Sequence, residues 1–326
     1  MNFFAPSCAF GSAAVWAVAS VWYSRLSKDH SVFAVNFARA SVAFPLFILA
    51  VFIAEGGILK GLVSYQGVQT SHLGWLSLSV LTSFGFGDAA FFWSTRFIGV
   101  PTAMAIAFSY PVLTMILSSL LLAEAISRLQ MLGVVLTAVG VAIVILECPA
   151  LEETSQSDPL NKRQNKYQNK YNDKKVTLSK YSRAMGLMGA FVTSLLWSLN
   201  SFATSKGGVG ITTAVGGSIR MMMALLLLLL IGGIGKVFTP GKSLVLPVVQ
   251  IRRFFWVFVL EAFCGTYLYV YGLSHSSLVL GVTLSSLSPV ISVPVAVLMR
   301  TEKFSFFRTL GVCLAVFGPL MVLFGV

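Results

Sequence analysis

Four ionisable side chains fall inside long apolar stretches of this 326-residue chain: Arg39, Asp88, Arg220 and Glu261. A charged group in such surroundings is costly, so it usually faces protein or water and has a function. At a rise of about 1.5 Å per residue, Arg39 and Asp88 lie roughly 12 Å and 10 Å from the same end of two successive predicted helices. We therefore expect a buried Arg39–Asp88 ion pair, which acts either as a structural clamp or as a gate or proton-coupling pair.

The second half of the chain does not repeat this arrangement. Arg220 occupies the place that corresponds to Arg39, but the counterpart of Asp88 is Thr266. Glu261 lies about 6 Å deeper, within reach of the long Arg220 stem but not level with it. Two roles stay open for Arg220, namely contact with an anionic substrate and satisfaction by carbonyls near the interface. We expect Arg39, Asp88, Arg220 and Glu261 to serve in gating or coupling.

Aromatic and small polar side chains in the same stretches are candidates for lining a binding pocket. Three pairs occupy matching places in the two halves: Trp16 with Trp197, Trp93 with Tyr271, and Tyr110 with Ser288. Such aromatics also serve as interface anchors or packing residues, and these alternatives stay open. The expected substrate-binding residues are Trp16, Trp93, Tyr110, Trp197, Asn200, Tyr267, Tyr271 and Ser288.

Several other chemistries need residues that the chain does not supply. Gly85-Phe-Gly-Asp88 matches the signature of intramembrane aspartyl proteases, which need two carboxylates that share a proton, but every other aspartate falls in a predicted loop. The three histidines lie at separate helix ends without metal-ligand spacing, and the four cysteines show no paired spacing. We predict no catalytic residue, no metal site, no cofactor and no enzyme activity.

The composition indicates which elements must position these side chains. Hydrophobic residues make up 56% of the chain and charged residues 10%, and the mean hydropathy is +0.85. Soluble proteins carry roughly a quarter charged residues, so the lipid bilayer is the expected solvent. The net charge is +12, but eight of the 23 basic residues lie in residues 162–183 and most others lie between apolar stretches. That placement is typical of membrane orientation, and no nucleic-acid partner is expected.

Ten apolar stretches approach the roughly 20 residues that a membrane-spanning helix needs. They run from about 4–24, 31–54, 73–95, 100–122, 128–147, 184–205, 211–234, 254–274, 278–299 and 305–325. The first is expected to be a retained span, because no basic residue precedes it as in a signal peptide. A polar segment at 148–183, expected to be a disordered linker, separates a repeat at 1–147 from one at 184–326.

The two halves are related by matching residues. Trp16 and Arg39 recur 181 residues later as Trp197 and Arg220. At a displacement of 178, Gly87, Pro111-Val112, Glu124, Ser127, Gly133 and Gly140 recur as Gly265, Pro289-Val290, Glu302, Ser305, Gly311 and Gly318. A repeat with five spans is inverted relative to its copy. The predicted fold is an all-α membrane protein with ten transmembrane helices in two inverted five-helix repeats, as in many secondary transporters.

The ordered set of residues resembles the EamA type of the drug/metabolite transporter superfamily. The resemblance rests on Trp16, Arg39, the segment 103–112, Leu122-Ala-Glu124, the span from Gly133 to Gly140, Ser285-Ser-Leu-Ser-Pro-Val290 and Thr301-Glu302. It implies a carrier, often an exporter, of small metabolites, amino acids or drugs that works by alternating access. The alternative is a non-transporting membrane receptor or assembly factor with a packed midplane, and a membrane enzyme is the third candidate.

Basic residues also bear on orientation. The loops between the ten predicted spans alternate between the two sides of the membrane. Apart from the two intramembrane arginines, 18 Lys and Arg residues fall in the odd-numbered loops and three in the even-numbered loops. The positive-inside rule then places the linker in the cytoplasm and both termini outside, whereas the resemblance implies termini inside. We expect a multi-pass protein of the cell membrane that binds a small-molecule substrate as a monomer or homodimer.

Overall fold

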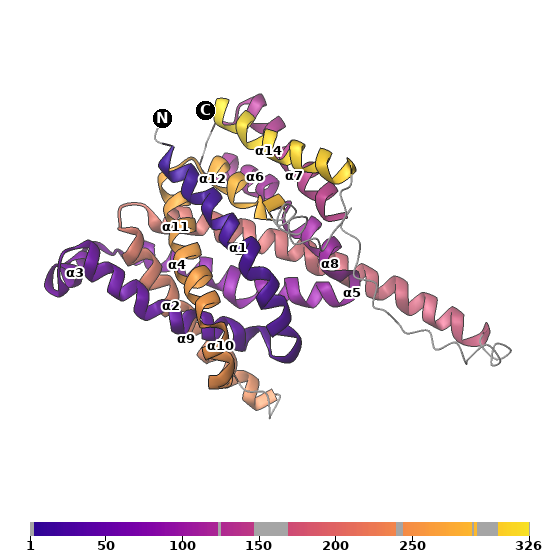
Figure 1. Ribbon diagram of the computed structural model, residues 1–326, viewed down its shortest axis with the longest axis horizontal. Coiled ribbons are helices and arrows are strands. Elements are labelled where there is room, and N and C mark those ends of the chain that lie inside the picture. The colour runs from indigo at the N-terminus through magenta and orange to yellow at the C-terminus, as the bar shows by residue number, and fades with distance from the viewer. Residues whose placement is uncertain are drawn as a thin grey trace.

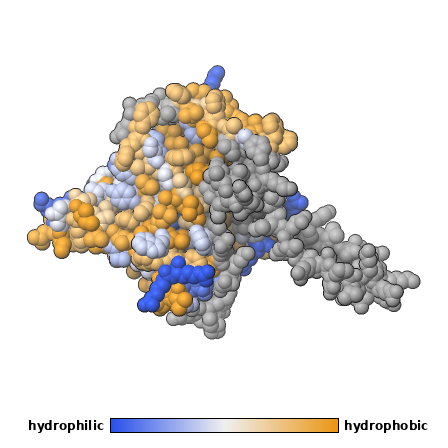
Figure 2. Space-filling view, in the orientation of Figure 1, coloured by the Kyte–Doolittle hydropathy of each residue, from blue (hydrophilic) through white to orange (hydrophobic). Residues whose placement is uncertain are grey.

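The computed structural model describes residues 3–122, 125–146, 169–238, 244–288, 290–291 and 306–325, and this part of the chain contains helices but no strand. The helices pack around a polar centre and expose apolar side chains outward (Figures 1 and 2). The expected all-helical class is therefore confirmed for the described residues.

The helices of the first half are α1 (Phe4–Asp29), α2 (Val32–Ala54), α3 (Ile58–Ser64), α4 (Thr70–Val80), α5 (Gly87–Ala107), α6 (Tyr110–Leu122) and α7 (Arg128–Leu146). Those of the second half are α8 (Asn169–Gly208), α9 (Thr213–Phe238), α10 (Val248–Phe258), α11 (Thr266–His275), α12 (Leu278–Ser285) and α14 (Phe306–Phe324). A π-helical turn, η2 (Leu81–Gly85), lies between α4 and α5, and a second, η3 (Val259–Gly265), joins α10 to α11.

Within the described residues, five segments are long and apolar enough to cross a bilayer. They are Val32–Ala54, Thr70–Ile98, Tyr181–Gly208, Thr213–Gly232 and Val248–His275. Four shorter apolar helices accompany them, at Phe4–Ala19, Tyr110–Leu121, Arg128–Ile143 and Thr309–Val322. The count of ten spans stays a prediction, because these lengths alone do not reach it.

Local capping explains several helix starts. Ser31 accepts a hydrogen bond from the Ala34 backbone N–H at the start of α2. Ser127 and Gln130 bond reciprocally to each other's backbone N–H at the start of α7, as in a capping box. Ser127 therefore caps α7, whereas its repeat counterpart Ser305 lies outside the described residues, as do Glu124, Pro289 and Glu302.

Two expected boundaries are wrong. The segment expected to be a disordered linker is not disordered throughout, since α8 is already helical from Asn169. The lysines of this stretch are good helix formers, which favours the early start of the helix. The loop expected at 96–99 is also helical, since α5 continues to Ala107. The chain turns instead at Phe108 and Ser109, and Pro111 lies in the first turn of α6, where the missing backbone N–H of a proline costs no helical hydrogen bond.

The packing pattern is symmetric between the two halves. In the first half, α1 packs on α11 and α12, and in the second half α8 packs on α4, α5 and α6. The second helices α2 and α9 pack on each other, and so do the last helices, α7 and α14, which lie side by side in Figure 1. When two helices pack on each other, their counterparts in the other halves also pack on each other. This pattern is expected for two copies related by a pseudo-twofold axis.

Small residues allow the tightest of these contacts. A Cβ atom on Gly133 would lie 2.5 Å from the Gly318 carbonyl oxygen, and one on Gly140 would lie 2.6 Å from that of Gly311. These glycines therefore allow close helix packing at the α7–α14 contact.

The two π-helical turns are also related by the repeat. η3 begins 178 residues after η2, the displacement found for the glycine pairs. A Cβ atom on Gly87 would lie 2.9 Å from the Trp197 indole, and one on Gly265 would lie 2.9 Å from Val15. Each glycine therefore lets the first helix of the opposite half approach. π-turns inside helices are frequently found at functional sites.

Candidate functional site

A polar cavity of about 140 Å³ lies where the two halves meet. Its walls come from α1, α2, α5 and α6 of the first half, from α8, α9, α11 and α12 of the second, and from both π-turns. The lining residues are Ser12, Trp16, Arg39, Ser83, Phe84, Asp88, Phe108, Tyr110, Trp197, Asn200, Ser201, Arg220, Glu261, Gly265, Thr266, Tyr269, Ser285 and Ser288. All four intramembrane ionisable residues are among them.

Arg39 is held by two carboxylates from different halves. Its Nη1 donates to Asp88 Oδ2 at 3.0 Å, so the ion pair expected from helix depth is present. Its Nε and Nη2 donate to the two oxygens of Glu261 at 3.0 and 2.7 Å. The expectation that Glu261 would serve Arg220 is thus not met. Glu261 reaches across the interface because η3 places it opposite α2.

Neighbouring polar groups complete this cluster, which we call the Arg39 triad (Arg39, Asp88 and Glu261). Tyr23 donates its hydroxyl to Glu261 Oε2 at 2.8 Å. Asn36, one helical turn before Arg39, donates to Asp88 Oδ2 at 3.1 Å and accepts from Arg39 Nη1 at 2.8 Å. The guanidinium also lies 4.7–5.5 Å from the ring centroids of three aromatic side chains, Trp16, Tyr23 and Phe84. Buried charges of both signs are therefore paired and hydrogen-bonded, as burial requires.

Arg220 has a different environment. The side chain is 3% exposed, yet both ion pairs found among the described residues belong to Arg39 and none to Arg220. Its Nη2 donates to Asn200 Oδ1 at 3.0 Å, and its Nε is buried with no hydrogen-bond partner in the part of the chain that is described. The guanidinium lies 5.9 Å from the ring centroid of Tyr269. The expected satisfaction of Arg220 by carbonyls near the interface is not found in these contacts.

A hydrogen-bonded chain fixes the orientation of Asn200. Ser201 donates to the Trp197 carbonyl at 2.9 Å, so its hydroxyl accepts from the Tyr269 hydroxyl, 2.8 Å away. Tyr269 in turn accepts from Asn200 Nδ2 at 3.2 Å. The amide oxygen of Asn200 is then left to face Arg220. Asn200 is therefore a preorganised acceptor for the guanidinium.

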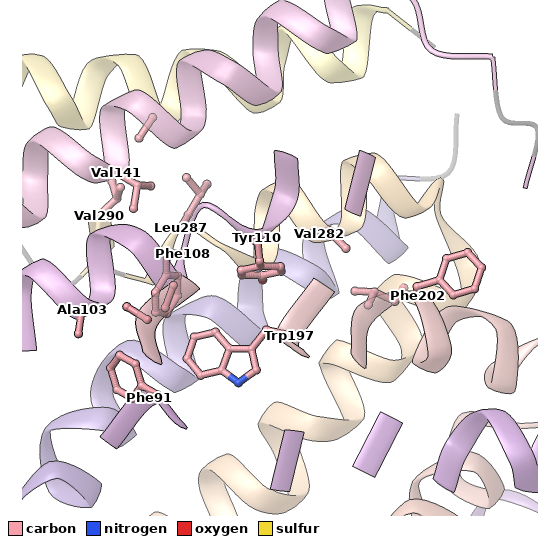
Figure 3. Close-up of a cluster of buried hydrophobic side chains, with 14 of the residues drawn as sticks. Phe91, Ala103, Phe108, Tyr110, Val141, Trp197, Phe202, Val282, Leu287 and Val290 are labelled. Atoms are coloured by element: carbon pink, nitrogen blue, oxygen red, sulfur yellow. The ribbon is translucent and has the colours of Figure 1, made fainter. Parts of the chain in front are cut away.

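Aromatic rings form another wall of the cavity. The Trp197 indole lies 5.4 Å from Phe91, 5.5 Å from Phe108 and 6.3 Å from Tyr110, measured between ring centroids, and Figure 3 shows these rings around it. Tyr110 also lies 2.9 Å from the Ser285 hydroxyl, which donates to the Val282 carbonyl and so accepts from Tyr110. The apolar wall and the charged groups share one cavity, an arrangement typical of small-molecule sites.

The structure brings together most but not all of the residues expected at the site. Trp16, Tyr110, Trp197, Asn200 and Ser288 line the cavity, together with the four ionisable residues.

Three expected substrate-binding residues do not line the cavity. Trp93 is 38% exposed and makes an edge-to-face contact with Phe97. Tyr267 packs on Phe47, and Tyr271 stacks on His275. Each of the three side chains is therefore directed to helix contacts outside the cavity.

Sequence reasoning also missed several cavity residues. Tyr269 is the repeat counterpart of Phe91, which has no polar group, so symmetry did not single it out. Asn36, which binds the Arg39 triad and does not itself line the cavity, could have been found from the sequence. It lies one helical turn from Arg39 on the same helix face. Among the described residues there is no group of histidine, cysteine and acidic side chains able to hold a metal ion.

Two halves of apolar helices that enclose a cavity with charged, polar and aromatic side chains define a class of helical membrane protein with a central cavity. The sequence profile of the EamA-like transporter family matches residues 4–146 and 184–324, one match in each half. The chain therefore belongs to the EamA-like transporter family and is an integral membrane protein. This result confirms the family predicted from the ordered residue set.

Two further comparisons address the fold and the curated relatives. A crystal structure of a protein with 16% sequence identity aligns with 98% of this chain and with 96% of its own, at a TM-score of 0.68. That likeness shows the fold alone. Among curated proteins, none matches the chain.

Proposed function

We propose that this protein is a ten-span secondary transporter that moves a small metabolite by alternating access. The observation that carries the proposal is the cavity lined by matching positions of both halves, such as Trp16 with Trp197 and Arg39 with Arg220. In inverted-repeat transporters the substrate site lies between the repeats, and rocking of one repeat against the other exposes it to each side in turn.

The size of the cavity favours a small metabolite over a drug. Its volume of about 140 Å³ is several times the roughly 30 Å³ that one water molecule takes in the liquid, so it can hold a small organic molecule. Sites for drug-sized ligands usually measure about 300–1,000 Å³. We infer that the substrate packs an apolar part against Trp197 and Tyr110 and directs polar groups toward Asn200 and Ser288.

The Arg39 triad fits the role of a gate. Arg39 and Asp88 belong to the first half and Glu261 to the second, so these ion pairs join the two halves directly. Rocking must break the Arg39–Glu261 contact, whereas Asp88 can stay with Arg39.

The competing function is a receptor or assembly factor on the same fold. It predicts a tightly packed midplane, and the charged cavity argues against it. Export across the cell membrane is the direction favoured by the resemblance to metabolite exporters.

The test is transport by the purified full chain in proteoliposomes. Vesicles are loaded with a uniformly ¹³C-labelled extract of small metabolites, and released compounds are identified by mass spectrometry. We expect release of a small set of compounds, and we expect Trp197→Ala to abolish it. Trp256→Ala, which removes an indole that is 77% exposed, is the matched control and should transport normally. Absence of any protein-dependent release would refute the proposal.

A further inference from the structure

The two arginines of the cavity have different neighbouring side chains. Arg39 meets carboxylates at two positions, Asp88 and Glu261. At the displacement of 178 residues, the counterparts of those positions are Thr266 and Ser83, and both also line the cavity. The positions that carry acids around Arg39 thus carry neutral hydroxyls in the equivalent places around Arg220.

Arg220 consequently carries a charge without a contacting counter-charge. A guanidinium cannot lose its proton in a protein, so the positive charge remains. A buried donor without a partner costs free energy, and Nε of Arg220 is such a donor among the described residues. Nη2 is engaged by Asn200, whose amide is oriented by Tyr269. The guanidinium is thereby held in a fixed orientation at the cavity wall.

We propose that Arg220, oriented by Asn200, binds the carboxylate of a singly charged organic anion, which is the substrate class of this carrier. The inference rests on the proposed function, because it names the substrate of the same cavity. A planar guanidinium matches a carboxylate with two parallel hydrogen bonds. The Arg39 triad in the same cavity already carries one net negative charge, and this favours a singly charged carboxylate over a doubly charged phosphate. The rings of Trp197 and Tyr110 then contact the apolar body of the anion.

One substitution tests this assignment without changing the shape of the site. Asn200→Asp places a resident carboxylate about 3.0 Å from Nη2, where the amide oxygen now lies. Arg220 then has a permanent partner, so the variant should be at least as stable as the wild type while losing the anion site. Arg220→Gln removes the charge itself. Arg183→Gln, which changes an exposed arginine on the same helix as Asn200, is the control.

The measurement is release of the ¹³C-labelled metabolite extract from proteoliposomes, with each released compound classified by charge. We expect released compounds to carry a single carboxylate and Asn200→Asp to lower their release at least tenfold, while its melting temperature in detergent does not fall. Excess benzoate should compete, and its neutral analogue benzamide and inorganic phosphate should not. Arg183→Gln should behave as the wild type.

Each other outcome is decisive. Release of neutral or cationic compounds, or of carboxylates that Asn200→Asp does not affect, overturns the anion site and leaves the transporter standing. Competition by phosphate in place of benzoate overturns the carboxylate assignment. If the protein releases no labelled compound, both the proposed function and this inference are refuted. If Arg220→Gln fails to fold, the Asn200→Asp result decides alone.

Discussion

The Arg39 triad makes a quantitative prediction about stability. Arg39→Met keeps a side chain of similar length but removes the cation that two buried carboxylates share. Breaking a buried ion pair by removing one partner costs about 3–5 kcal/mol, because the other charge is left bare. Here Asp88 keeps only Asn36, and Glu261 keeps only Tyr23. We therefore expect a loss at the upper end of that range, a large share of the roughly 5–15 kcal/mol that holds a typical protein folded.

A compensating variant separates charge from packing. When Asp88→Asn and Glu261→Gln are added to Arg39→Met, no bare charge remains, and neutral replacement of a whole buried ion cluster is often harmless. The triple variant should therefore recover most of the lost stability. The assay is equilibrium unfolding of the purified full chain in detergent micelles, followed by tryptophan fluorescence. A triple variant no more stable than Arg39→Met, or a single variant as stable as the wild type, would refute the reasoning.

Three further predictions concern packing and the cavity wall. Gly133→Val should lower the free energy of unfolding by about 1–3 kcal/mol, because its side chain meets the Gly318 carbonyl, and the micelle assay measures this loss. Tyr110→Phe removes one hydrogen bond and should cost about 1 kcal/mol in that assay, since Ser285 stays bonded to Val282; a larger loss would indicate a wider role. Trp93→Ala should leave the initial rate of proteoliposome transport unchanged, because the indole does not line the cavity, and a transport defect comparable to that of Trp197→Ala would contradict this placement.

The sequence was most informative about features that depend on residue positions within one half or on one pair of matching positions in the two halves. Helix depth predicted the Arg39–Asp88 contact because both residues belong to the same half and are reached by counting residues along straight helices. Repeat symmetry likewise pointed to Trp16 and Trp197. Gly133, Gly140, Gly311 and Gly318 recur at one displacement in the two halves, but the sequence did not reveal that α7 and α14 pack on each other through them.

The partner of Glu261 could not be obtained in this way. Its depth was counted with the rise of an α-helix, whereas the residue lies in a π-turn that changes the direction of its side chain. Its partner Arg39 is in the other half, and no count within one repeat reveals how two halves face each other. Tyr269 was missed because its counterpart Phe91 has no hydroxyl, and Trp93 was included because symmetry marks equivalent positions without saying which way they point.

The central claim is that two related halves enclose a cavity that opens to each side of the membrane in turn. It is tested most directly by placing one cysteine at Ser12, a cavity residue that is 7% exposed, in a background without the four native cysteines, and labelling it with a membrane-impermeant thiol reagent. We predict labelling from either side in right-side-out and inside-out vesicles, and protection by the transported compound in both. A cysteine that is reached from one side only, or from neither, would contradict alternating access.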